Sequence, residues 1–198
     1  MATRRFTEHG KCIYCRQSLV YCVCEFITPL TGNTLISYII HFKEIYLPSN
    51  TAHFFSMMYK QTEFHVRGKK ETRELSSEII SPKHHPLYLF PSADAVELTP
   101  EFISSIDKPI QLIIPDGRWK QVHNVWRREK VLLPITRVKL PPGPPSIYKL
   151  RKTPKENAVS TFEATARALG MIESQQLQTQ LEVAFEKITQ KIYSHKPY

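Results

Sequence analysis

The sequence contains little glycine, no long apolar run and no cysteine after residue 24. Its six glycines form no Gly-x-Gly pattern, so it lacks the glycine-rich loops that hold phosphates in many nucleotide-binding enzymes. No stretch reaches the roughly 18 apolar residues of a membrane-spanning helix, and residues 1–10 are polar and charged. We therefore expect a soluble, cytoplasmic protein that does not enter a membrane.

Acidic residues are scarce in one part of the chain. Residues 116–155 contain eleven Lys or Arg but only two Asp or Glu, an excess that equals the net charge of +9 of the whole chain. Basic residues gathered in this way favour a polyanionic partner, with a solvated charged surface as the alternative. The 198 residues, 41% of them hydrophobic, suffice for one sizeable core with a small appendage.

The four cysteines all lie in one short segment, at Cys12, Cys15, Cys22 and Cys24. Thiolates are good ligands for tetrahedral zinc, and a reducing cytosol opposes disulfide bonds. We therefore predict a structural zinc site with four protein ligands and no open position for chemistry; four reduced or bridged cysteines are the alternative. The prediction divides the chain into a cysteine-rich zinc-binding segment, residues 1–30, and a main domain, residues 31–198.

Short apolar runs alternate with helical patterns along the main domain. Strands are predicted at residues 35–40, 87–90, 110–114 and 135–140; the strand at 110–114 is expected to be buried, and that at 135–140 carries Arg137 and Lys139 on one face. Asn50 or Thr51 can cap one helix, and Ser160 with Glu163 forms a capping box for another, which Gly170 can end. Apolar residues at helical spacing in residues 177–192 indicate core packing or a dimer face. The alternation predicts an α/β fold.

The most informative segment is Asp116-Gly117-Arg118-Trp119, which follows the predicted strand at residues 110–114. Open α/β sheets bind ligands at the carboxyl ends of their strands, so Asp116 and Trp119 are candidate site residues. Asp116 could instead serve only to form a Pro-Asp-Gly turn, and Trp119 only to fill the core. A helical pattern starts at Trp119, with apolar residues on one face and basic residues on the other.

Taken with the cysteines, several segments in order resemble the DTW-domain family, whose members are tRNA-uridine aminocarboxypropyltransferases. The resemblance extends from Cys12 to about Ile172. Phe42 and Ala52 replace the family's Pro and Gly in two amino-terminal segments, and Arg118 stands where Thr or Ser is usual. The matching segments are His41-Phe42-Lys43-Glu44, Pro48-Ser49-Asn50-Thr51-Ala52, Leu87-Tyr88-Leu89-Phe90-Pro91-Ser92, Tyr148-Lys149-Leu150-Arg151-Lys152 and Ser160-Thr161-Phe162-Glu163-Ala164.

The resemblance implies a fold related to the knotted SPOUT methyltransferases, although periodicity in a sequence cannot show a knot. It also implies that residues 31–198 form a catalytic domain that binds S-adenosylmethionine in three loops. The first lies around Ser92, the second around Asp116 and the third between Leu150 and Thr161. The cofactor-binding residues that it implies are Pro91, Ser92, Ile114, Asp116, Gly117, Leu150, Ser160 and Thr161. The implied reaction transfers the 3-amino-3-carboxypropyl group of the cofactor to N3 of a tRNA uridine.

Two residues are the catalytic candidates. Asp116 can accept the proton of uridine N3 or hold the base by a hydrogen bond, and Trp119 can stack on a flipped base. For Arg151 and Lys152, tRNA phosphates, the cofactor carboxylate and a solvated surface all remain open. The residues predicted to bind tRNA are Arg118, Lys120, Arg127, Arg128, Arg151 and Lys152.

Three alternatives to this reading stay open at this point. The first two are a SPOUT-like RNA methyltransferase and an rRNA aminocarboxypropyltransferase. The third is a non-catalytic, zinc-stabilised RNA-binding protein, to which the departures at Phe42, Ala52 and Arg118 give weight. The sequence indicates neither the tRNA, nor the uridine, nor the oligomeric state.

Overall fold

A parallel β-sheet forms the centre of the protein in the computed structural model, which describes residues 10–68, 75–117, 119–148 and 158–194. The strands are β1 (Leu35–His41), β2 (Thr62–Arg67), β3 (His85–Leu89), β4 (Val96–Glu97), β5 (Ile110–Asp116) and β6 (Thr136–Lys139). The helices are α1 (Thr51–Met58), α2 (Pro100–Ser104), α3 (Trp119–Arg128), α4 (Thr161–Ile172) and α5 (Gln175–Tyr193). None of the described helices is long and apolar enough to cross a membrane.

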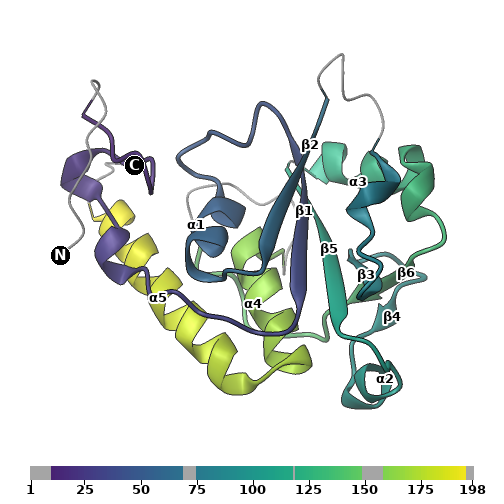
Figure 1. Cartoon of the computed structure of the whole chain (residues 1–198). Helices are drawn as coiled ribbons and strands as arrows, with labels where there is room; N and C mark the ends of the chain where they lie inside the picture. Colours follow the sequence, from purple (N-terminus) through teal and green to yellow (C-terminus); the bar gives the residue numbers. More distant parts are fainter. Residues whose placement is uncertain (1–9, 69–74, 118, 149–157, 195–198) are drawn as a thin grey trace.

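The strand order of the sheet is β2-β1-β5-β3-β6-β4, and every pair is parallel. In register, Ile40 of β1 pairs with Asp116 of β5, and Tyr88 of β3 pairs with Ile113 of β5. Because all strands run the same way, their carboxyl ends meet at one edge of the sheet, at the top of Figure 1. This edge is where open α/β sheets bind ligands.

Each face of the sheet is covered by helices. Leu112 and Ile114 belong to the main core beneath α1, α4 and α5, whereas Ile113 belongs to a smaller cluster with Val122 and Val125 of α3. This alternation is the two-residue period of a strand that is buried on both faces. Figure 1 shows α1, α4 and α5 gathered on one side and α3 on the other. The prediction of an α/β fold is confirmed. The apolar residues at helical spacing in α5 are buried in the described structure, so the prediction that they pack in the core is confirmed as well.

Two helices begin where the sequence predicted. The Asn50 side chain accepts the backbone N–H of His53 at the start of α1, and Ser160 and Glu163 form both bonds of a capping box at the start of α4. The prediction that Gly170 ends this helix was wrong, because α4 continues to Ile172. Gly170 serves close packing instead: a Cβ there would lie 1.9 Å from Oε1 of Gln178 on α5.

The sheet differs from the prediction in its edges. Strands β2 and β4 were missed because their residues are half-buried or exposed and form no apolar run. Strand β5 continues past Ile114, since Pro115 and Asp116 still pair with β1. Asp116 is therefore the last residue of a strand rather than part of the loop after it. The SPOUT-like knot stays a prediction, because residues 149–157, between β6 and α4, lie outside the described residues.

Candidate functional site

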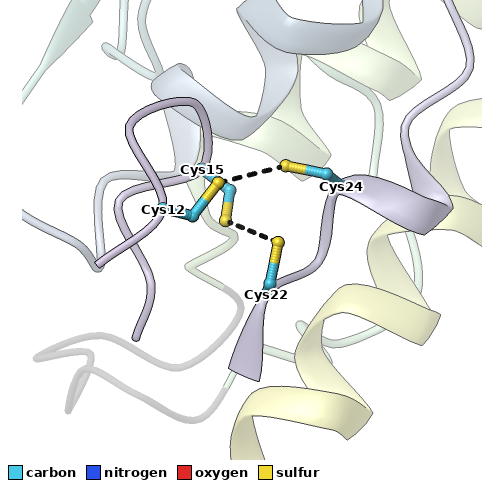
Figure 2. Close-up of side chains that lie close together, drawn as sticks. All are labelled: Cys12, Cys15, Cys22 and Cys24. Atoms are coloured by element: carbon cyan, nitrogen blue, oxygen red, sulfur yellow. Dashed lines mark hydrogen bonds between the residues drawn. The ribbon is translucent and has the colours of Figure 1, made fainter. Parts of the chain in front are cut away.

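The four cysteine sulfurs form a compact cluster, shown in Figure 2. Sγ of Cys12 lies 3.6 Å from Sγ of Cys24, and Sγ of Cys15 lies 3.8 Å from Sγ of Cys22. All four sulfurs lie within 4.8 Å of one another. A disulfide needs about 2.05 Å between sulfurs, whereas four sulfurs around a tetrahedral zinc at about 2.3 Å lie about 3.8 Å apart. The distances fit a zinc site and exclude disulfides.

A tight turn brings the first two cysteines together. The Cys12 N–H donates to the carbonyl of Gln17 and the Arg16 N–H donates to the carbonyl of Cys12, both at 2.8 Å. Burial alone would raise the pKa of Cys12, but backbone hydrogen bonds from Cys15 and Tyr14 lower this pKa to about 7. Burial raises the pKa of Cys15 to about 11. The hydrogen-bonded turn therefore favours the thiolate form at Cys12, and a metal bound in the cluster would favour that form at all four cysteines.

A second cluster surrounds Asp116 at the carboxyl edge of the sheet. The Asp116 side chain is 9% exposed. Its Oδ1 accepts the hydroxyl of Thr161 at 2.6 Å, and its Oδ2 accepts the side-chain amide of Asn50 at 3.2 Å. Asn50 caps α1 and Thr161 is the first residue of α4. The carboxylate thus joins the end of β5 to the amino ends of two helices, which favour a negative charge.

Asn50 contributes both halves of its amide to this cluster. Its oxygen caps α1, while its nitrogen donates to the carbonyl of Glu44 at 3.0 Å and to Asp116. Sequence reasoning assigned Asn50 a capping role only and missed the contact with Asp116. The resemblance of residues 48–52 to a family segment was the one signal that could have pointed to it.

The backbone carbonyl of Thr161 ends a further chain of two hydrogen bonds. Thr165 donates its hydroxyl to the carbonyl of Thr161 at 2.7 Å and accepts the hydroxyl of Tyr38 at 2.8 Å. Burial and, to a smaller extent, the charge of Asp116 raise the pKa of Tyr38 well above its ordinary value, so Tyr38 stays protonated and donates. Tyr38 and Thr165 were also missed, because a tyrosine in a strand and a threonine in a helix carry no pattern that marks them.

Glu163 brings the two ends of the third predicted loop together. Its carboxylate accepts the backbone N–H groups of Ser160 and Ile147, both at 2.8 Å, and the hydroxyl of Ser146 at 2.6 Å. The Tyr148 hydroxyl donates to the carbonyl of Ser49 at 2.7 Å. The chain therefore enters and leaves residues 149–157 beside α4 and the start of α1, next to Asp116.

The first predicted loop follows β3, the neighbour of β5 in the sheet. Pro91 is exposed and Ser92 is half-buried. The Ser92 Oγ is buried and has no hydrogen-bond partner among the described residues. An unpaired buried hydroxyl at this edge fits a polar ligand that supplies the missing bond. The Ile114 side chain is buried in the main core, so a ligand can meet only its backbone. Gly117 has a φ of 148°, which glycine tolerates best.

The remaining predicted residues fall into two groups. Arg118, Leu150, Arg151 and Lys152 lie outside the described residues, as do the side chains of Trp119 and Lys120, whose backbone begins α3. Arg127 and Arg128 are exposed at the end of α3, followed by exposed Lys130. The acid between them, Glu129, is buried and forms an ion pair with Arg67. The three exposed cations therefore form a basic surface.

Comparison with known proteins gives a consistent set of relatives. The chain is 27% identical to tRNA-uridine aminocarboxypropyltransferase 2 of Macaca fascicularis over 82% of this chain and 56% of the relative. It is 27% identical to the protein of that name in Drosophila melanogaster, over 84% of this chain and 68% of the relative. It is 25% identical to the protein of that name in Mus musculus, over 84% of this chain and 59% of the relative.

The chain thus spans little more than half the length of the two mammalian relatives. No solved structure is similar to it at a significant level. The DTW domain matches residues 9–193, which include the cysteine cluster, the sheet and the Asp116 cluster. The protein belongs to the DTW-domain family.

Proposed function

We propose that the protein transfers the 3-amino-3-carboxypropyl group of S-adenosylmethionine to N3 of a uridine in tRNA. N3 would lose its proton and form a bond to the carbon of this group, the bond from that carbon to sulfur would break, and methylthioadenosine would leave. The observation that carries the proposal is the Asp116 carboxylate, which two helix amino ends hold at the carboxyl edge of a parallel sheet. The relatives named tRNA-uridine aminocarboxypropyltransferase 2 support the same reaction class. We further propose that residues 31–198 form the catalytic domain and residues 1–30 the zinc-binding segment.

The cofactor would lie where the three predicted loops approach the end of β5. Ser92, with its unpaired hydroxyl, and the backbone of Ile114, Asp116 and Gly117 would hold it from the sheet edge. Ser160 and Thr161, together with Leu150, would hold it from the α4 side. When bound, S-adenosylmethionine supplies a carbon that its sulfonium has already activated. The task of the protein is then to orient that carbon toward the base.

Asp116 is suited to act on the uridine base. An ionised carboxylate offers about four acceptor positions, and the structure assigns one on each oxygen to Thr161 and Asn50. Held in this way, the group presents a fixed negative charge to the N3–H of uridine, either as a hydrogen-bond acceptor or as a general base. Trp119, at the start of α3, would stack on the base.

Basic residues would bind the tRNA backbone on the α3 side of the site. The structure exposes Arg127, Arg128 and Lys130 there. Phosphate contacts of this kind position an RNA without reading its sequence. We extend the proposal to the remaining predicted cations, Arg118, Lys120, Arg151 and Lys152. In the cysteine segment, zinc held by four thiolates would have a structural role only.

Nucleoside mass spectrometry tests the proposal. The protein is incubated with labelled S-adenosylmethionine and either bulk tRNA or rRNA, and the nucleosides are then analysed. A uridine carrying the added mass of the aminocarboxypropyl group, from tRNA alone, is the expected result. A methyl mass would assign the protein to the methyltransferases, and product from rRNA alone would change the substrate. RNA binding without any product would leave a zinc-stabilised binding protein.

A further inference from the structure

Four apolar side chains are exposed beside the cysteine cluster. Ile13 and Tyr14, between the first two cysteines, are 43% and 51% exposed. Tyr46 and Leu47, in the loop that joins β1 to α1, are 75% and 37% exposed. We call these four residues the aromatic surface. Two exposed tyrosines beside two exposed aliphatic side chains are uncommon on a surface that has no partner.

The two halves of the aromatic surface are held to each other by hydrogen bonds. The Arg16 guanidinium donates to the carbonyl of Ile45, and the side chain of Gln17 donates to the carbonyl of Pro48 at 2.6 Å. On α1, Nε2 of His53 lies 2.7 Å from the carbonyl of Tyr14. Burial and the nearby Arg16 lower the pKa of His53 to about 4, so its ring is neutral and donates to this carbonyl. The surface is therefore preorganised.

The charges around the aromatic surface are positive. The Arg16 guanidinium lies 5.4 Å from the centroid of the Tyr46 ring, and Lys43 is exposed in the same loop. Residues 10–20 contain no acid, and the one acid of residues 42–50, Glu44, is only 6% exposed. Exposed aromatic rings among cations, with no exposed carboxylate in residues 10–20 and 42–50, match unpaired RNA bases and their phosphates. Protein interfaces also use exposed aromatic rings, so it is the cations, Arg16 and Lys43, that favour a polyanionic partner over an apolar or basic one.

The aromatic surface adjoins the Asp116 cluster. Tyr46 is four residues before Asn50, so at most about 14 Å of extended chain separates it from the residue whose amide holds Asp116. Figure 1 shows the cysteine segment and the β1–α1 loop on the same side of the sheet's carboxyl edge, with α3 on the other. A strand of RNA with its uridine at Asp116 could thus contact both sides.

We propose that the aromatic surface binds unpaired bases of the RNA substrate that flank the modified uridine, by stacking on Tyr14 and Tyr46. The proposal rests on the function proposed above. It assigns the cysteine segment a part in RNA binding. A metal held by the four cysteines would fix the turn that carries Tyr14, and the hydrogen bonds from Arg16 and Gln17 to the β1–α1 loop hold this turn beside Tyr46.

Equilibrium binding of tRNA to the full chain tests the proposal. Tyr14→Ala and Tyr46→Ala should each weaken binding by about tenfold, because one stacked base is lost in each case. The salt dependence of binding should not change, since no phosphate contact is removed. Tyr14→Phe and Tyr46→Phe should retain the affinity, because they keep the ring. Val183→Ala, at a 46% exposed position on α5, is the control for loss of exposed apolar surface.

Two results would overturn the proposal: a Tyr14→Ala/Tyr46→Ala double variant with the tRNA affinity of the wild type, or Phe variants as weak as the Ala variants. The first would reassign the surface to a protein partner. Zinc content and melting temperature, which exposed side chains should not alter, confirm that each variant is folded. Wild-type protein that binds tRNA through the two tyrosines but forms no aminocarboxypropyluridine would overturn the proposed function and leave the surface standing.

Discussion

The cysteine cluster and the Asp116 cluster are assembled in opposite ways. Cys12 and Cys24, the outermost ligands, are 12 residues apart along the chain. In contrast, Asp116 meets Asn50 and Thr161 across 66 and 45 residues. The first cluster is built from a turn and two short 3-10 helices, Leu19–Tyr21 and Cys24–Phe26, whereas the second requires that β5, α1 and α4 are already packed.

The difference also determines what each cluster can do. Four thiolates around a metal would leave no open position, so we expect the cysteine cluster to stabilise the protein rather than to catalyse. A buried carboxylate that accepts hydrogen bonds from two helices keeps a defined orientation at a ligand-binding edge. We therefore expect changes in the first cluster to affect stability most and changes in the second to affect turnover most.

The largest stability effect should come from Cys22→Ser. We expect the wild type to bind on the order of one zinc ion per chain. Loss of one ligand should remove most of this zinc and lower the free energy of unfolding by about 3 kcal/mol or more. The melting temperature should fall by about 10 °C. Metal analysis and thermal unfolding measure both effects. Ser18→Ala is a matched control, because the Ser18 hydroxyl has no hydrogen-bond partner in the described structure. The prediction would be contradicted if metal analysis found no zinc in wild-type protein that was purified without a chelator.

The largest activity effect should come from Asp116→Asn. This change keeps the shape and removes the charge, and it turns one acceptor position into a donor that faces Asn50 or Thr161. We expect transfer to fall by about 100-fold or more, while the affinity for S-adenosylmethionine changes little. Single-turnover kinetics and isothermal titration separate the two quantities. Turnover close to that of the wild type would leave Asp116 with a structural role only.

A smaller effect should follow from Thr161→Val, which removes the hydroxyl that Asp116 Oδ1 accepts. Loss of a buried hydrogen bond to a charged group should cost about 1–3 kcal/mol of stability. We also expect kcat to fall more than KM rises, because the carboxylate loses its orientation. Thr161→Ser restores the hydroxyl and should restore kcat. Equal loss in the Val and Ser variants would mean that the methyl group, not the hydrogen bond, matters.

The smallest effect on the protein itself should come from replacing Arg127, Arg128 and Lys130 by Gln. Their exposed side chains should leave stability and cofactor affinity unchanged. The slope of log affinity for tRNA against log salt should become shallower by about 2–3, since up to three fewer counterions are released on binding. An unchanged slope would identify this surface as solvated only and place the RNA elsewhere.

A control with equal charge change sharpens this last measurement. Lys83, Lys108 and Lys187 are also exposed, and the first two precede β3 and β5 at the opposite edge of the sheet. Their replacement by Gln lowers the net charge by the same amount but should leave the salt slope nearly unchanged. A comparable loss of slope would indicate a general effect of charge rather than a binding surface.

Local patterns predicted the parts of the fold that local contacts build. The caps at Asn50 and Ser160 were readable because each side chain bonds to a backbone group three residues ahead. Gly170 was misread because an identical glycine pattern serves either a helix end or close packing, and the choice depends on Gln178 of the next helix. Strand β2 was missed because an edge strand needs no apolar run.

The sequence by itself determined which residues form the cysteine cluster, the main strands and the helix starts, because those features depend on spacings of a few residues along a covalent chain. Tertiary structure alone decided that Asp116 would be held by Asn50 and Thr161, and that the cysteine segment would lie against the β1–α1 loop. The physical reason is the strand order. Placing β5 beside β1 brings its last residue to the amino ends of α1 and α4, and no local pattern encodes which strands become neighbours.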